Sequence, residues 1–114
     1  MALLHDAGEA FTGDVPMPAK SSALKAALQR AEEGALAPVL TAGQRAVWHE
    51  VEDGTSLEAR VVKAADKLQL VIKALTYEAQ NRGDLDEFFV VPEHAKYLDI
   101  ELARASFEEV ARRR

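Results

Sequence analysis

The stretch that decides the fold is Leu3–Pro16, with the sequence LLHDAGEAFTGDVP. His5 and Asp6 are adjacent, Glu9 follows about one helical turn later, and Asp14 closes a Thr-Gly-Asp turn. Apolar residues recur around them at helical spacing, namely Leu3, Leu4, Ala7 and Phe11. The sequence therefore predicts the last turns of a buried helix over residues 1–11, with a His-Asp pair inside it.

A second acidic residue stands in another apolar segment. Asp66 lies within VKAADKL, residues 62–68, whose apolar positions repeat at helical spacing. A helix rarely buries a carboxylate unless this group is paired or bound to a metal ion. We therefore expect Asp66 to be one half of an ion pair or a metal ligand.

The residue types fit a cation site. Adjacent helical residues point about 100° apart, so His5 and Asp6 share a metal only if the ion lies between their directions. A distal ligand such as Asp66 is then needed to complete the coordination. Imidazole with carboxylates suits Mn, Fe, Co or Ni, and less often Zn or Mg. Glu9, four residues after His5 on the same helical face, could orient or deprotonate a water molecule beside the ion.

Together, residues 3–20 and 56–78 resemble the HD-domain metal-dependent phosphohydrolases, and most closely their small nucleoside 5′-monophosphate phosphatase branch. The resemblance implies an all-α fold, an HD-domain-like helical bundle occupying residues 1–114 as a single domain. It implies that His5, Asp6 and Asp66 are metal ligands, that Glu9 is catalytic, and that Asp14 acts near the substrate. The bundle is expected to be N-terminally truncated, because the family carries another metal-binding histidine on an earlier helix.

The resemblance also implies an activity. We expect a metal-dependent phosphohydrolase that removes phosphate from a phosphomonoester, a (deoxy)nucleoside 5′-monophosphate, with Mn, Co, Fe, Ni or Mg as cofactor. The alternative is a non-catalytic remnant of the family that serves as a helical oligomerisation or ligand-binding module. The absent upstream histidine motivates this alternative. His49 and His94 are candidates to replace it, although each sits in a context typical of a surface residue.

Composition agrees with one globular domain, since 48% of the 114 residues are hydrophobic and 29% are charged. A net charge of −5 argues against a nucleic-acid polymer as partner, but a bound cation could still attract a small phosphorylated substrate. The absence of cysteine excludes disulfides and a thiolate zinc site. Without an apolar run of membrane-spanning length or a signal peptide, we expect a cytoplasmic protein with no membrane partner.

Capping residues and helix breakers delimit the other helices. Helices are predicted from Ser21 or Ser22 to about Glu33, from Pro38 or Thr41 to about Glu52, and from about Leu57 to Gln80. A short element is expected over residues 85–90, and a final helix or helix pair from Pro92 to Arg112–Arg114. The longest helix should bury a stripe made of Leu57, Val61, Ala65, Leu68, Ile72 and Leu75. If upstream helices are absent, exposed apolar faces predict a homo-oligomer.

Overall fold

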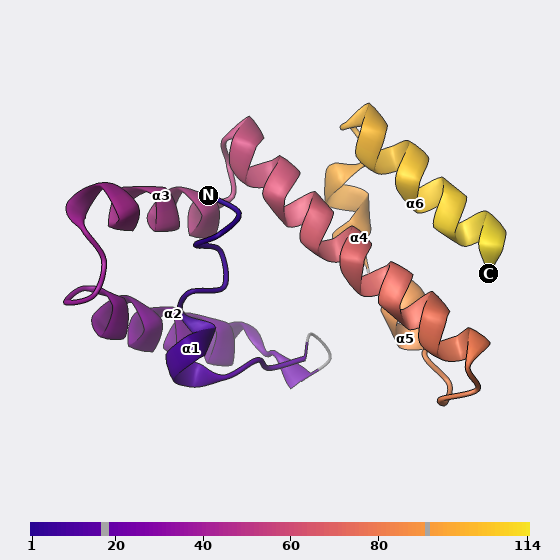
Figure 1. The fold of residues 1–114 in the computed structure, drawn as a ribbon, viewed down its shortest axis with the longest axis horizontal. Coiled ribbons are helices and arrows are strands. Elements are labelled where there is room, and N and C mark those ends of the chain that lie inside the picture. Colours follow the sequence, from indigo (N-terminus) through magenta and orange to yellow (C-terminus); the bar gives the residue numbers. More distant parts are fainter. Residues whose placement is uncertain (17–18, 91) are drawn as a thin grey trace. The chain divides into compact units, whose positions relative to one another are not determined.

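The computed structural model describes residues 1–16, 19–90 and 92–114, which form helices and turns and, over these ranges, no strand. The prediction of an all-α fold is therefore confirmed. The chain divides into two compact units, Met1–Ala59 and Arg60–Arg114. Figure 1 labels the α-helices α1 to α6, and the text calls the 3-10 helix η2. In chain order the elements are α1 (Glu9–Thr12), α2 (Ser22–Leu36), α3 (Ala42–Asp53), α4 (Leu57–Ala79), α5 (Asp86–Phe89), η2 (Pro92–Tyr97) and α6 (Glu101–Arg113).

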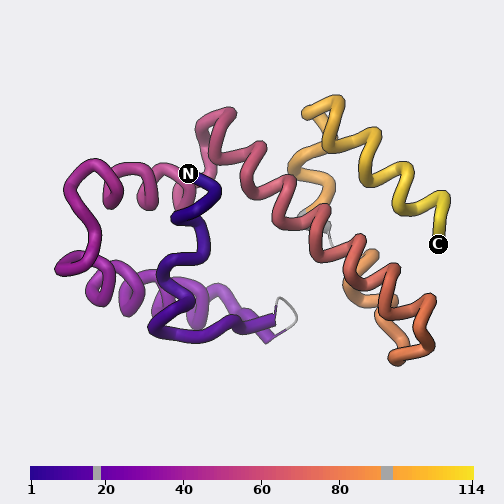
Figure 2. The backbone as a smooth tube through the Cα atoms, viewed as in Figure 1, coloured from indigo at the N-terminus to yellow at the C-terminus, as the bar shows by residue number. Residues whose placement is uncertain are grey.

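In the first unit, α2 and α3 form a helical hairpin, and the short α1 packs on α2 (Figure 2). Ser21 caps α2 by accepting a hydrogen bond from the Leu24 amide at 3.1 Å, as its position before an apolar helix predicts. The helix was predicted to end at about Glu33, but α2 continues through Gly34 to Leu36, because a single glycine lowers helix stability without preventing the helix.

Local signals also define α3. The Thr41 hydroxyl accepts from the Gln44 amide at 3.2 Å, and the Gln44 side chain accepts from the Thr41 amide at 2.9 Å. This reciprocal pair is a capping box, and it fixes the start of α3 at the second of the two predicted positions. Gly54, with φ of 66°, ends the helix in the left-handed conformation that glycine adopts without strain. Leu36, Trp48 and Val51 are buried.

At the start of α4, Ser56 provides the cap, because its hydroxyl accepts from the Ala59 amide at 3.2 Å. The predicted start of this helix at about Leu57 is confirmed. At the other end, Asn81 adopts a left-handed conformation with φ of 54°. This is the conformation expected of a residue that follows a helix.

In the second unit, α4 buries small residues. Ala64 packs in a cluster with Tyr97 of η2 and Ala103 of α6, and Val71 and Ala74 are buried on the same helix. The predicted stripe is instead largely exposed: Leu57 is 64% exposed, and Val61 and Ile72 are each 47% exposed. The helix therefore has two apolar faces, and the one with small side chains is covered because it lets neighbouring segments approach closely.

The segments after α4 confirm the predicted short element and the final helix pair, as α5, η2 and α6. Arg60 ties α4 to the η2–α6 turn by donating to the Lys96 carbonyl at 2.9 Å and to the Asp99 carboxylate at 2.5 Å. Arg114 donates to the carboxylates of Glu78 and Asp86. Its guanidinium also stacks over the Phe89 ring at 4.0 Å. Both ends of α6 are therefore attached to the rest of this unit.

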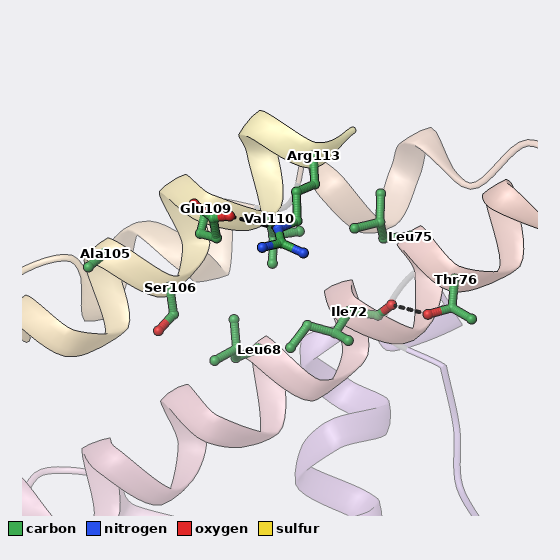
Figure 3. A pocket seen from close by; sticks show the side chains of 9 residues that line it. All are labelled: Leu68, Ile72, Leu75, Thr76, Ala105, Ser106, Glu109, Val110 and Arg113. Atoms are coloured by element: carbon green, nitrogen blue, oxygen red, sulfur yellow. Dashed lines mark hydrogen bonds and ion pairs between the residues drawn. The ribbon is translucent and has the colours of Figure 1, made fainter.

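A groove of roughly 570 Å³ lies between α4 and α6 (Figure 3). Its lining is mainly apolar, with a Glu109–Arg113 ion pair on the α6 side. The lining residues are Leu68, Ile72, Leu75, Thr76, Ala105, Ser106, Glu109, Val110 and Arg113. Among the described residues, no helix combines the length and the apolar character needed to cross a membrane.

Candidate metal centre and active site

The His-Asp pair lies in a series of turns rather than in a regular helix. Successive turns over residues 1–9 are closed by amide-to-carbonyl hydrogen bonds three residues apart, such as Leu4 to Met1 and Glu9 to Asp6, both at 3.0 Å. The predicted buried helix over residues 1–11 is therefore wrong, and Leu3 is 98% and Phe11 55% exposed. A segment of eleven residues is too short to form a stable helix by itself. A series of turns can contain the same apolar residues at the same intervals in the sequence.

His5 and Asp6 nevertheless bring their side chains together. The His5 Nε2 and Asp6 Oδ2 atoms are 3.1 Å apart. The other ring nitrogen, Nδ1, is 2.5 Å from the Ala2 carbonyl oxygen. Since a carbonyl only accepts hydrogen bonds, Nδ1 is assigned the proton, and Nε2 is the nitrogen that faces the carboxylate. Such a backbone contact is the usual way in which a metal-ligating imidazole is oriented.

This donor pair fits a divalent cation. In octahedral coordination, metal–nitrogen and metal–oxygen bonds of about 2.0–2.2 Å place adjacent ligand atoms about 3 Å apart. The separation of 3.1 Å between Nε2 and Oδ2 matches that value. The imidazole nitrogen and the carboxylate oxygen can each donate an electron pair to one cation. The two residues therefore form a suitable half of a metal site.

Glu9 begins α1 and is half-buried. The pKa of its carboxyl group is raised above the ordinary value of 4.5, first by burial and then by the negative charges of Asp6, Asp14 and Glu32. The positive charge of Lys20 opposes this shift. A carboxylate with a raised pKa is a stronger base than an exposed glutamate. The position and the chemistry of Glu9 both suit proton transfer.

Asp14 is exposed and follows Gly13, whose φ of 74° permits the sharp change of chain direction after α1. The Gly13 amide ends α1 by donating to the Glu9 carbonyl at 2.8 Å. The charge of Asp14 acts on the pKa of Glu9, as does that of Asp6. The structure therefore brings three of the predicted site residues, Asp6, Glu9 and Asp14, into one electrostatic environment.

Asp66 lies on α4, and its side chain is 40% exposed. Its carboxylate oxygen is 3.5 Å from the Lys67 ammonium group. The prediction that an apolar helix buries this acid is wrong, because Ala64, Val71 and Ala74 define the buried face and Asp66 lies to one side of it. Its expected pairing is present, with Lys67 as the partner. A half-exposed carboxylate beside a lysine remains chemically able to bind a cation.

The two other histidines have different partners. His49 Nε2 is 3.4 Å from the Glu33 carboxylate, and its ring meets Trp48 edge-on at 5.1 Å. His94 stacks on Phe107 of α6 with ring centroids 4.9 Å apart. Neither of these contacts involves a predicted metal ligand.

The sequence interpretation missed two acidic features. Glu32 on α2 contacts α1: its Oε1 accepts a hydrogen bond from the Thr12 hydroxyl at 2.7 Å. The helical spacing of Leu28, Glu32 and Leu36 places Glu32 on the apolar face of α2, and this was the available signal. The second feature is a cluster of three acidic residues, Glu78, Asp84 and Asp86, whose carboxylate oxygens lie within 4.8 Å of one another. Arg114 already pairs with two of its members.

Comparison with known proteins identifies the family. The family model described as HD domain matches residues 1–102. A 5′-deoxynucleotidase HDDC2 of Danio rerio is 37% identical over 102 residues, covering 82% of this chain and 50% of the relative. A 5′-deoxynucleotidase HDDC2 of Dictyostelium discoideum is 32% identical over 101 residues, covering 78% of this chain and 52% of the relative.

The chain thus spans about half the length of the curated relatives that it matches. No solved structure matches it. The predicted resemblance is confirmed by the match over residues 1–102 and by the two nucleotidase relatives. The chain belongs to the HD-domain family.

Proposed function

We propose that this protein is a metal-dependent phosphohydrolase that removes phosphate from a deoxynucleoside 5′-monophosphate. The observation that carries the proposal is the 3.1 Å approach of His5 Nε2 to Asp6 Oδ2 in a chain of the HD-domain family. The names of the two relatives, both 5′-deoxynucleotidases, support this substrate class. HD-domain membership supports a divalent cation as cofactor, and we propose Mn, Co, Fe, Ni or Mg as its identity.

His5, Asp6 and Asp66 would hold the cation. The first two offer converging nitrogen and oxygen donors, and Asp66 offers a half-exposed carboxylate. Its assignment as the distal ligand, and the treatment of residues 1–114 as a single HD-type domain, rest on the family resemblance. When bound, a divalent ion lowers the pKa of a coordinated water molecule and polarises a phosphoryl oxygen.

Glu9 would take the proton from the attacking water. Its carboxyl group has a raised pKa, chiefly because it is partly buried, and this makes it a better proton acceptor once deprotonated. The proton it receives would then be available to the leaving nucleoside oxygen. Asp14, exposed beyond the Gly13 turn, would orient the substrate or assist the leaving group.

Metal content and phosphate release test this function directly. The protein is loaded with Mn²⁺ or Co²⁺, its metal stoichiometry is measured, and inorganic phosphate is followed with a panel of nucleoside and deoxynucleoside 5′-monophosphates. Stoichiometric metal with metal-dependent release supports the proposal. Glu9→Gln should keep the metal and lose turnover, whereas Glu50→Gln, an exposed glutamate on α3, is the matched control.

Other results would separate the alternatives. Metal binding without phosphate release from any member of the panel contradicts catalysis and favours the ligand-binding module. If the protein neither binds metal nor releases phosphate, the metal centre itself is refuted.

We also propose that the protein is cytoplasmic and self-associates. Exposed apolar side chains on α4 and α6, namely Leu57, Val61, Ile72 and Leu102, support self-association. The molar mass in dilute solution tests it by light scattering, and a well-folded monomer at every concentration would contradict it. Fractionation of cells that express the protein tests the compartment.

A further inference from the structure

Glu32 links α2 to the short helix that carries Glu9. The Thr12 hydroxyl donates to Glu32 Oε1 at 2.7 Å, and this bond joins residues 20 positions apart in the sequence. Thr12 is the last residue of α1, so the bond holds the C-terminal end of that helix. The same hydroxyl also lies 3.4 Å from the Gly8 carbonyl oxygen.

The Glu32 side chain also packs on the N-terminal end of α1. Gly8 immediately precedes Glu9 and is buried. A β-carbon at position 8 would lie 2.5 Å from Glu32 Oε2 and 2.7 Å from Glu32 Cβ. The φ of −62° at Gly8 is available to any residue, so glycine is needed here for space rather than for backbone conformation. Glu32 therefore contacts both ends of the turn that presents Glu9.

The helix between these contacts cannot hold its own shape. α1 has four residues, well below the length of about 12–15 at which an isolated helix is even marginally stable. The position of the Glu9 backbone, from which its carboxylate extends, must therefore be set by groups outside α1. Among the contacts of α1 described above, the Glu32 side chain is the group that reaches it from another helix.

The choice of a carboxylate at this position is informative. Glu32 lies near the negative charge of Glu9 and raises the pKa of that carboxyl group, so this is an unfavourable place for another acid. A charged acceptor makes a shorter and stronger hydrogen bond to a hydroxyl than a neutral one does. The carboxylate of Glu32 therefore makes a strong hydrogen bond with Thr12, although its negative charge is repelled by that of Glu9.

We propose that Glu32 is a positioning residue, which fixes the Glu9 carboxylate for catalysis through Thr12 and Gly8 without touching the substrate. The proposal rests on the function proposed above. It assigns to α2 a part in the active site that the His-Asp-x-x-Glu sequence alone does not contain.

Steady-state kinetics provide the first test. Because outer partners of catalytic groups typically contribute about 10–100-fold, we expect Glu32→Ala to lower kcat by roughly that factor and to change KM by less than about threefold. Thr12→Val should lower kcat in the same direction. The double variant should be little worse than Glu32→Ala, because both changes break one contact. Glu32→Gln, which keeps a neutral and therefore weaker acceptor for Thr12, should have a kcat between those of the wild type and Glu32→Ala.

The neighbouring residue gives a matched control. Glu33 is exposed and pairs with His49, so Glu33→Ala removes one carboxylate from the same turn of α2 without affecting α1. It should leave kcat unchanged. Full activity in Glu32→Ala overturns the proposal. Glu32→Gln that is as inactive as Glu32→Ala also overturns it, because the carboxylate would then act by its charge.

Amide hydrogen exchange supplies a readout independent of turnover. In metal-free protein without substrate, Glu32→Ala should accelerate exchange at Thr12 and Gly13, whose amides close α1, by about tenfold, the typical effect of losing one hydrogen bond. Exchange in α3 should not change. If Glu32→Ala leaves exchange at Thr12 and Gly13 unchanged, the proposal that Glu32 stabilises α1 is refuted. If the wild-type protein has no phosphatase activity, the proposed function fails while the exchange result still decides whether Glu32 holds α1.

Discussion

Adding one carbon atom at Gly8 tests the packing of α1 on α2. In Gly8→Ala, the new β-carbon would meet Glu32 Oε2 at 2.5 Å, Cδ at 2.6 Å and Cβ at 2.7 Å. These distances are far below van der Waals contact. The carboxylate could rotate away, but the Glu32 β-carbon is fixed to the α2 backbone, so the two helices must separate locally.

The magnitude follows from two opposing effects. Overpacking of this kind costs about 1–3 kcal/mol. Alanine restricts the unfolded chain more than glycine does, and this returns about 0.4–1 kcal/mol where the backbone conformation is acceptable, as it is at φ of −62°. The expected net loss of stability is roughly 1–2 kcal/mol. For a chain of 114 residues, this corresponds to a fall in Tm of roughly 4–8 °C.

Thermal unfolding followed by circular dichroism measures this change. Gly34→Ala is the matched control, since Gly34 lies in α2 and nothing is within 4 Å of the position its β-carbon would take. This control should be more stable than the wild type by about 0.5–1 kcal/mol. Adding Glu32→Ala to Gly8→Ala should restore part of the loss, because only the contact with Glu32 Cβ remains. A Gly8→Ala protein as stable as the Gly34→Ala control would refute the close approach.

Three further predictions concern the caps, the pH dependence and the metal. Thr41→Ala should destabilise the protein by about 1 kcal/mol in denaturant titrations, because it removes the capping box of α3. Thr55→Ala is the control: Thr55 precedes Ser56, the residue that caps α4, and its loss should change stability by less than about 0.5 kcal/mol. The pKa of Glu9 is raised in the folded state, so the contribution of Glu9 to stability decreases as pH rises from 4.5 through the raised pKa of the folded protein. Metal-free Glu9→Gln should match the wild type in stability well below pH 4.5 and be the more stable protein above the raised pKa. A Tm difference between the two proteins that does not depend on pH would contradict the shift. Asp66→Asn should weaken Mn²⁺ binding in calorimetry by at least about tenfold, because even outer partners of metal ligands contribute that much, and unchanged affinity would remove Asp66 from the site.

The sequence predicted the helices well where local chemistry decides their ends. Ser21 and Thr41 cap α2 and α3, and Gly54 ends α3, because capping depends on residues within one turn of each other. The His-Asp pair could likewise be read directly, since the two side chains are adjacent in the chain. Such signals do not require knowledge of the tertiary structure.

The errors arose where burial depends on distant partners. Leu57, Val61 and Ile72 have ideal helical spacing, but periodicity cannot say which of two apolar faces of α4 is covered. The first eleven residues gave a helical pattern that turns also satisfy. The spacing of Leu28, Glu32 and Leu36 places Glu32 on the apolar face of α2, but it does not say what Glu32 contacts. Its role appears only when α2 lies against Gly8 and Thr12, which are distant from it in the sequence.

The small residues on the buried side of α4 have a consequence for how this family can diverge. Ala64 meets Tyr97 and Ala103 in one cluster, so the space opposite its methyl group is already filled by an aromatic ring and a second helix. A larger side chain at position 64 alone would overpack the cluster, at a cost of about 1–3 kcal/mol. Position 64 should therefore remain small among homologues, or change together with a reduction at 97 or 103. The least variable face of α4 is then expected to be the one with the smallest side chains.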